Sequence, residues 1–283
     1  MPTQRYKLIV AYRGTAYHGW QWQPAQKSFS KGPMPREGMG LPTIQQSLSR
    51  ALGRIIGHPV TVVGSSRTDA KVHAKGQVAH FDTDQVQIPP ENIRRATNHQ
   101  LPDDILIRSI EAVPDSFSAI ASTESKRYQY LIWNTDDRPL FTPDLAWYRW
   151  QPLDIAAMQE AAKYFIGTHD FKTFARPGHG RVTTERTVLD CSVSCRSPRL
   201  VVAVEGKGFL WHMVRIMVGT LVEIGLGKHR PEAIAEMIAA KDRRKAGGTA
   251  PAHGLYLQWV KHRAWEGDHD LSGQPFNDDS SID

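Results

Sequence analysis

Alternating hydrophobic and polar positions predict strands and amphipathic helices in an order that occurs twice along the chain. Near the start, Tyr6, Leu8, Val10 and Tyr12 recur at every second position, which is typical of one face of a strand. Apolar positions spaced three and four apart follow over 44–55, which predicts a helix. The predicted elements of the first half are a strand over 6–12, a helix over 43–55, strands over 60–63 and 77–81, a helix from Pro90 and a strand over 105–110.

The second half repeats this order. Thr43 and Asp154 precede the two long amphipathic patterns as N-cap residues, and Gln46 lies at capping-box spacing from Thr43. Both halves approximate the β-α-β-β-α-β plan of ferredoxin-like units, which RNA-recognition domains share, so the predicted fold class is α+β. The predicted elements of the second half are a strand over 126–134, a helix from Asp154 to Phe165, strands over 187–195 and 200–205, helices over 209–226 and 231–240, and a strand over 255–260.

Length and composition divide the chain into two modest domains. With 283 residues, we place an N-terminal half at 1–115 and a C-terminal half at 116–265. Residues 24–41 are rich in Gly, Pro, Lys and Ser, which predicts a flexible insertion between the first strand and its helix. Residues 266–283 predict a disordered acidic tail.

The charge distribution favours a polyanionic partner. The formal net charge is +6, and the tail contributes six acids and no Lys or Arg. Without those six negative charges, the rest of the chain carries +12. A body this basic makes a nucleic acid a sensible partner.

Neither a leader nor a membrane segment is expected. Residues 1–5 lead into a strand pattern without an apolar region first, and the longest apolar stretch, 209–226, contains His212, Arg215 and Glu223. Cys191 and Cys195 lie four apart in a strand-like segment and match no zinc spacing, so we expect reduced structural residues. These features predict a cytoplasmic protein.

The strongest candidate for chemistry is the loop GSSRTDAKVHA, from Gly64 to Ala74, between two predicted strands. Loops carried by a rigid sheet often hold functional residues. On an extended backbone, Arg67 and Asp69 point the same way. Taken alone, however, the pattern also fits a surface cation at Arg67. It also fits a turn aspartate at Asp69 that accepts backbone hydrogen bonds.

The whole loop resembles the signature loop of the tRNA pseudouridine synthase A family. Four further blocks resemble that family's motifs in the same order, and together they span nearly the whole chain. They are AYRGTAYHGWQWQ from Ala11, SKRYQY from Ser125, GFLWHMVR from Gly208 and TAPAHGLYL from Thr249.

The resemblance implies an activity and a fold. It implies isomerisation of uridine to pseudouridine at positions 38, 39 and 40 of the tRNA anticodon stem-loop, after the nucleotide is flipped from its stack. It also implies two similar halves with a catalytic cleft between them, a homodimer, and no cofactor or metal. No glycine-rich phosphate loop or His-x-x-x-His pair in the sequence points to another chemistry.

The resemblance also implies site residues. Asp69 would be the catalytic carboxylate, as a nucleophile or as a base, and Arg67 would fill the space left by the flipped nucleotide. Tyr128 would stack on the uracil and assist its proton transfer, although aromatics at this spacing are more often sheet core. Leu210 would pack on the other side of the base.

Arg215 is informative from its surroundings alone, because apolar residues flank it in the predicted helix. Arginine is rarely buried unless it is paired. Glu223 is two helical turns away, so Asp69 is the best candidate partner, in line with the family's second arginine. The alternative is that Arg215 extends to solvent.

Basic residues supply candidate RNA contacts, although each is individually most often a solvated charge. The family usually has glycine at the places of Ser66 and Lys71, and we expect Lys71 to take an ordinary φ and to contact RNA backbone. The other candidate RNA contacts are His73, Lys126, Arg127, Arg149, Arg176, Arg181, Arg186, Arg243, Arg244 and Lys245.

Two other functions are compatible with parts of the pattern. A non-catalytic RNA-binding protein or chaperone could share the duplicated fold, but it would not need an acid at Asp69 beside Arg67 and Tyr128. An Asp-dependent nucleoside hydrolase would act on free nucleosides and would not need a basic surface.

Overall fold

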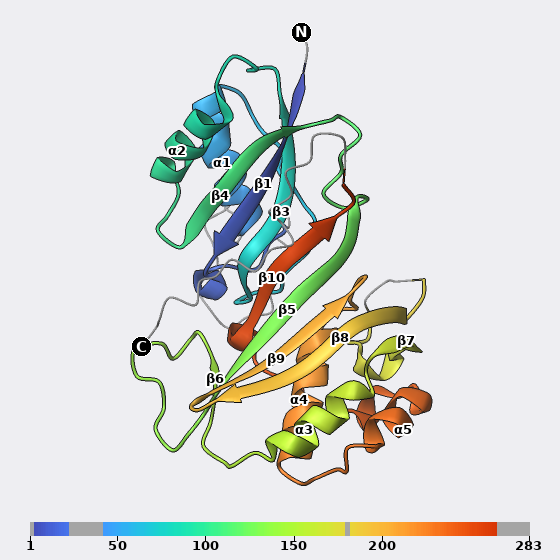
Figure 1. The fold of residues 1–283 in the computed structure, drawn as a ribbon. Coiled ribbons are helices and arrows are strands. Elements are labelled where there is room, and N and C mark those ends of the chain that lie inside the picture. Colours follow the sequence, from blue (N-terminus) through green and yellow to red (C-terminus); the bar gives the residue numbers. More distant parts are fainter. Residues whose placement is uncertain (1–2, 23–41, 179–181, 265–283) are drawn as a thin grey trace. The chain divides into compact units, whose positions relative to one another are not determined.

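The structure, a computed structural model, describes residues 3–22, 42–178 and 182–264 and forms two compact units (Figure 1). The first unit takes in the described residues of Met1–Glu124 and Leu257–Asp283, and the second is Ser125–Tyr256. The insertion expected at 24–41, the tail expected at 266–283 and Arg181 lie outside the described residues.

The first unit is a sheet with two helices. Its sheet has the strand order β4-β1-β3-β10, with β2 paired to β3, and β1 runs antiparallel to both β3 and β4. The helices α1 and α2 lie side by side on one face of this sheet (Figure 1). The elements are β1 (Gln4–Tyr12), η1 (Gly14–Ala16), α1 (Ile44–Ile56), β2 (Val63–Gly64), β3 (His73–Thr83), α2 (Pro90–Gln100), β4 (Ile105–Val113) and β10 (Leu255–His262).

Local sequence signals account for most of these elements. The Thr43 side chain accepts a hydrogen bond from Gln46 N, and the apolar stripe of α1 is buried, as predicted. The alternating face of β1 is buried too. Its opposite face is also covered, because Lys7 is 1% exposed and pairs with Glu111 at 2.9 Å. β1 pairs with a strand on each edge, so it is an inner strand of this sheet, and side chains on both of its faces are buried.

The second unit contains the remaining paired strands and three helices. Its strand order is β5-β9-β8-β7, with β6 parallel to β5, and α3 packs on both β8 and α4. Asp154 caps α3 by accepting a hydrogen bond from Ala157 N, as predicted. The elements are β5 (Thr123–Asn134), β6 (Trp147–Arg149), α3 (Ile155–Lys163), β7 (Gly167–Asp170), η2 (Phe171–Phe174), β8 (Glu185–Arg196), β9 (Arg199–Gly206), α4 (Met213–Gly225), α5 (Ala233–Ala240), η3 (Arg243–Lys245) and η4 (Ala252–Gly254).

The α+β class is confirmed, with differences in detail. The helix expected from 209 begins only at Met213, because His212 has a left-handed φ of 62° that no helix continues. The strand expected over 60–63 pairs only at Val63–Gly64, and the short strands β6 and β7 were not predicted. From Leu257 onward the last strand groups with the first unit, whereas the sequence pattern assigned it to the C-terminal half.

Cys191 and Cys195 are both free; Cys191 is buried and Cys195 is exposed. No helix within the described residues is long and apolar enough to cross a membrane.

Candidate active site

The loop that carries Asp69 lies between β2 and β3 in the first unit. Arg67 is exposed and Asp69 partly exposed, whereas Thr68 between them is 7% exposed. On an extended backbone this alternation leaves the side chains of Arg67 and Asp69 on the accessible side of the loop. The loop thus carries an arginine and a carboxylate on the same accessible side.

Gln77 on β3 holds the entrance of this loop. Its Oε1 accepts a hydrogen bond from Ser66 N at 3.2 Å, and its Nε2 donates one to Ser66 O at 2.6 Å. Gln77 is fully buried, so these bonds form away from competing water. The sequence analysis missed this residue. The available signal was an amide side chain next to the apolar pair Val78 and Ala79 in a predicted strand, since a buried amide needs hydrogen-bond partners.

The end of β1 and the segment that follows it support the middle of the loop. The hydroxyls of Tyr12 and Thr68 share a hydrogen bond of 2.8 Å, and Trp20 N donates to Thr68 O at 3.1 Å. The Trp20 side chain is 2% exposed, and its ring centroid lies 6.0 Å from that of Tyr12. The first family-like motif therefore acts in this structure as a scaffold for the loop that bears Asp69.

Two glycines allow this close approach. Gly19 has a φ of +91°, and a Cβ atom there would lie 2.4 Å from Thr68 O. A Cβ atom at Gly14 would lie 2.0 Å from Val72 O. Gly14 N also donates a 3.0 Å hydrogen bond to Nδ1 of His73, which is 1% exposed. His73 thus lies inside the unit, where it holds the end of the loop.

The expectation that Lys71 takes an ordinary φ is wrong, because its φ is +67°. The turn explains this conformation. Lys71 N donates to Tyr17 O, and Val72 N donates back to Asp69 O, each at 3.2 Å. A residue other than glycine costs about 1–2 kcal/mol in this left-handed region. The Lys71 side chain is exposed, so the strain lies in the backbone and not in side-chain packing.

Tyr128 and Leu210 belong to the second unit. Tyr128 lies on β5 and is 7% exposed, and its ring meets that of Phe209 edge-on, with centroids 5.3 Å apart. Leu210, the next residue after Phe209, is 4% exposed. Edge-to-face contact fixes the plane of an aromatic ring. The contact with Phe209, which belongs to the same unit, thus fixes the plane of the Tyr128 ring.

Arg215 lies in the first turn of α4 and is partly buried. Its Nε donates to Ala250 O at 2.8 Å, and Ala250 N donates to Arg215 O at 3.0 Å. Close by, the Tyr130 hydroxyl donates to Pro251 O at 2.7 Å. Burial raises the pKa of Tyr130, and the positive charge of Arg215 partly opposes that shift. Arg215 and Tyr130 therefore hold the segment that begins the last family-like motif.

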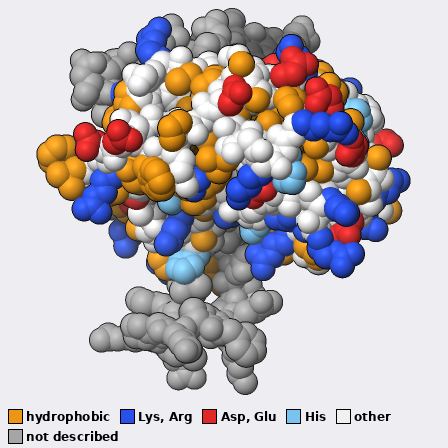
Figure 2. Space-filling view, turned by 90° about the horizontal axis from the view of Figure 1, so that it is seen from below, with side chains coloured by type: hydrophobic (Ala, Val, Ile, Leu, Met, Phe, Trp, Pro, Cys, Tyr) orange, Lys and Arg blue, Asp and Glu red, His pale blue; other side chains and the backbone are white. Residues whose placement is uncertain are grey.

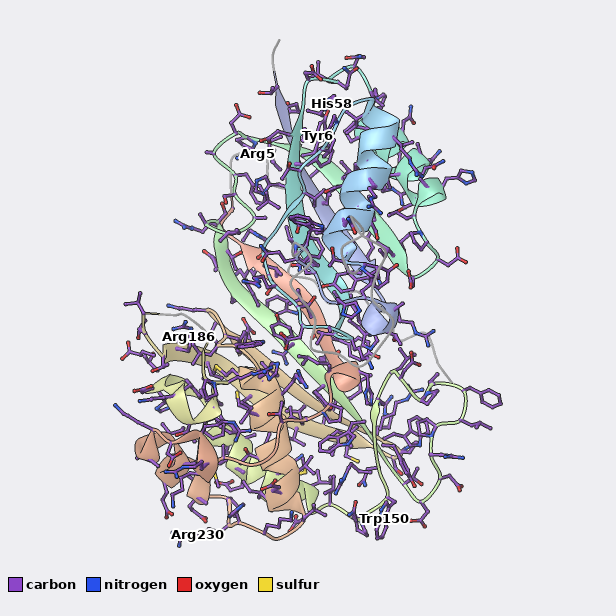
Figure 3. All side chains as sticks on the ribbon, turned by 180° about the vertical axis from the view of Figure 1, so that it is seen from behind. Arg5, Tyr6, His58, Trp150, Arg186 and Arg230 are labelled. Atoms are coloured by element: carbon purple, nitrogen blue, oxygen red, sulfur yellow. The ribbon has the colours of Figure 1, made fainter. Side chains whose placement is uncertain are left out.

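The predicted RNA contacts of the second unit have different surroundings. Arg127 lies 3.0 Å from Asp190 Oδ2 and 3.4 Å from Glu205 Oε2, so its charge is compensated within the unit. Lys126, beside it on β5, is opposite Gly206. Arg149 lies over the Trp147 ring, 5.2 Å from its centroid. Arg186, labelled on β8 in Figure 3, donates to Thr183 O.

Three further predicted contacts share one place. Arg176, Arg243 and Arg244 line a single cleft of the second unit. As for metals, no three His, Cys, Asp or Glu side chains in the part of the chain that the structure describes are grouped to hold an ion.

Comparison with known proteins identifies the class. A model of the tRNA pseudouridine synthase family matches residues 8–120 and 161–262. The tRNA pseudouridine synthase A of Moorella thermoacetica is 44% identical over 257 residues, covering 90% of this chain and 98% of that protein. The enzyme of the same name from Brevibacillus brevis is 43% identical over 254 residues, with the same coverage. That from Acetivibrio thermocellus is 41% identical over 251 residues, covering 89% and 96%.

These matches define an RNA-modifying isomerase with the α+β pseudouridine synthase fold. The chain belongs to the tRNA pseudouridine synthase family. The resemblance inferred from the motifs is confirmed at the level of the family.

Proposed function

We propose that this protein converts uridine to pseudouridine at positions 38, 39 and 40 of the tRNA anticodon stem-loop, as a cytoplasmic homodimer that uses no cofactor. The observation that carries the proposal is the Asp69 loop, a carboxylate and an arginine on a backbone fixed by buried hydrogen bonds. Near-full-length similarity to proteins named tRNA pseudouridine synthase A supports the substrate.

The reaction rearranges bonds without gaining or losing atoms. The C1′–N1 bond breaks, the uracil turns, and a C1′–C5 bond forms; N1 then gains a proton and C5 loses one. Asp69 acts on the sugar or base as a nucleophile, or removes a proton as a base. Either role needs a carboxylate held still, which is what the bonds to Ser66 and Thr68 provide.

The other residues act on the position of the substrate. Arg67, exposed beside Asp69, takes the place of the flipped nucleotide, and its planar cation suits stacking and phosphate contact. Tyr128 and Leu210 contact the uracil, and Lys71 and Lys126 contact phosphates. His73 serves the site by holding the loop. The pairing of Arg215 with Asp69 stays a prediction.

The test is to incubate the protein with unmodified tRNA transcripts and to map pseudouridine at single-nucleotide resolution. We expect signal at 38, 39 and 40 wherever uridine is present, and none in transcripts with cytidine there. Signal confined to another arm of the tRNA would contradict the positions, and its complete absence would contradict the activity. Binding without any conversion would favour the non-catalytic RNA-binding alternative.

A further inference from the structure

Three polar side chains interrupt the apolar sequence of α4, and only Arg215 among them belongs to the candidate active site. Apart from Arg215 and Glu223, every residue of α4 is buried, and Thr220 is 0% exposed. The exterior differs, because on the face that Figure 2 shows, charged side chains of both signs lie among hydrophobic ones. Polar groups in a buried helix need hydrogen-bond partners, so the partners of Thr220 and Glu223 indicate what these side chains do.

Both side chains bind the glycine segment, which we define as residues 247–250. The Thr220 hydroxyl accepts a hydrogen bond from Gly247 N at 3.0 Å and donates its own proton to a backbone oxygen of α4 at 2.8 Å. Glu223 Oε1 accepts a hydrogen bond from Gly248 N at 3.0 Å. Two consecutive N–H groups of the glycine segment therefore have side chains of α4 as their acceptors.

The other end of the glycine segment is bound to Arg215. The Nε of Arg215 donates to Ala250 O at 2.8 Å, and Ala250 N donates to Arg215 O at 3.0 Å. Ala250 is 1% exposed, so both bonds are shielded from water. Because the side chain and the backbone of Arg215 bind the same residue, the place of Ala250 determines the direction of the guanidinium plane.

Glycines bring the glycine segment into direct contact with α4. A Cβ atom at Gly219, one turn after Arg215, would lie 1.9 Å from Gly248 O. A Cβ atom at Gly247 would lie 2.9 Å from Cα of Thr220. The two backbones therefore meet without side chains between them, and the polar contacts at the two ends set how the glycine segment lies on the helix.

This arrangement connects Glu223 to Arg215 without an ion pair. The two residues are eight positions apart, which separates them by about 12 Å along the helix axis. The glycine segment spans that separation, with Gly248 bound at the Glu223 end and Ala250 at the Arg215 end. A carboxylate suits this role, because it is a stronger acceptor of a backbone N–H than a neutral oxygen. The other oxygen of Glu223 lies 3.7 Å from His229 Nε2.

We propose that Thr220 and Glu223 are positioning residues for the isomerisation, which act through the glycine segment on the guanidinium of Arg215. The inference rests on the proposed function for the part that Arg215 takes in the reaction. Neither Thr220 nor Glu223 touches the substrate. Their effect is on the rate, because a displaced guanidinium stabilises the reacting groups less well. A role in folding alone would instead lower stability and leave the rate for bound tRNA unchanged.

The test uses pairs of variants that keep or remove one hydrogen-bond acceptor. Thr220→Val removes the hydroxyl that Gly247 N needs, whereas Thr220→Ser keeps the hydroxyl and removes a buried methyl group. Both should lower the thermal unfolding midpoint, so stability alone does not separate them. At the partly exposed Glu223, Ala removes the acceptor of Gly248 N and Gln keeps one. The control is Glu232→Ala, which removes an exposed acid of the same unit.

The measurements are the single-turnover rate at saturating enzyme, the Kd for unmodified tRNA and the unfolding midpoint. We expect Thr220→Val and Glu223→Ala to lower the rate about tenfold or more while the Kd stays within about twofold of the wild type. Thr220→Ser, Glu223→Gln and Glu232→Ala should keep rates within about threefold. The Glu223 pair gives the same comparison where Thr220→Val does not fold. Rates that follow the unfolding midpoint, with Thr220→Ser as slow as Thr220→Val, would overturn the proposal.

The Nε–H resonance of Arg215 gives a second readout that does not depend on activity. In an NMR spectrum of the arginine side chains, it is the signal that Arg215→Lys lacks. Because the bond to Ala250 O protects this proton, it should exchange slowly in the wild type, Thr220→Ser and Glu223→Gln, and faster in Thr220→Val and Glu223→Ala.

The two readouts separate this inference from the proposed function. A wild type that forms no pseudouridine but shows the expected exchange pattern would contradict the proposed function and keep the link between α4, the glycine segment and Arg215. An active wild type whose Arg215 Nε–H is equally protected in every Thr220 and Glu223 variant would overturn the inference and keep the proposed function.

Discussion

Gln77 is the residue on which the backbone before Arg67 and Asp69 depends most directly. Replacing it with Ala leaves the buried N–H and C=O of Ser66 without their partners, and we expect the free energy of unfolding to fall by about 1–3 kcal/mol. Because Asp69 would then be less well placed, kcat should fall while the Kd for tRNA changes little. Chemical denaturation and single-turnover kinetics measure both effects.

The matched control is Gln87→Ala, an exposed glutamine that follows the same strand. It should match the wild type in both measurements. If Gln77→Ala kept wild-type kcat despite the lost stability, Gln77 would support the fold without positioning the site.

Lys71 combines a strained backbone with an exposed charge, and two substitutions separate these features. Lys71→Ala removes the charge and keeps a side chain at a φ of +67°, whereas Lys71→Gly also relieves the strain. We expect the Gly variant to be more stable than the Ala variant by about 1 kcal/mol. Both should bind tRNA more weakly, with the salt slope reduced by about one unit. A collapse of the chemical step in both, at unchanged affinity, would instead place Lys71 in the catalysis.

At the scale of elements, the sequence predicted the features that depend on residues close together in the chain. The caps at Thr43 and Asp154 and the start of α2 at Pro90 follow from side chains next to the helix ends. The start of α4 could not be found by periodicity, because Phe209 and Leu210 are apolar for tertiary reasons: Phe209 packs against Tyr128, and Leu210 is buried. The grouping of β10 with the first unit depends on partners far away in the sequence.

The features of the candidate site also fall into two groups, those visible in the sequence and those that depend on tertiary contacts. Its motif residues could be read from the sequence, whereas Gln77 and the φ of Lys71 could not. Both depend on hydrogen bonds that form only when β3 and the segment after β1 meet the loop.

An ion pair between β1 and β3 makes the stability of the fold depend on pH. Arg5 donates to both carboxylate oxygens of Asp82, its register partner, and this holds the pKa of Asp82 below its usual value. A lowered carboxylate pKa stabilises the fold above the unfolded pKa, and the effect is lost as pH falls through the folded pKa. Both side chains are partly exposed, so the effect should be below about 1 kcal/mol.

Asp82→Asn should therefore unfold more easily than the wild type at pH 7 and equally easily at pH 2. Urea melts across this range measure the difference. A difference that stays constant with pH would show that the aspartate contributes through packing alone. The position of Arg5 near the start of β1 can be followed in Figure 3.

At the scale of the whole molecule, the proposal requires two copies of the chain. The family resemblance implies a homodimer, and a tRNA is large enough to contact both subunits. Sedimentation velocity at the concentrations used for activity should show a dimer, with or without tRNA. A monomer under conditions of full turnover would contradict this part of the proposal.

The central claim is that Asp69 carries out the isomerisation, and one comparison tests it most directly. Asp69→Asn removes the charge at constant size, and Asp103→Asn makes the same change at an exposed aspartate of the same unit. With saturating enzyme and unmodified tRNA, we expect Asp69→Asn to form no measurable pseudouridine while it binds tRNA like the wild type, and Asp103→Asn to retain full activity. Turnover by Asp69→Asn close to that of the wild type would contradict the account.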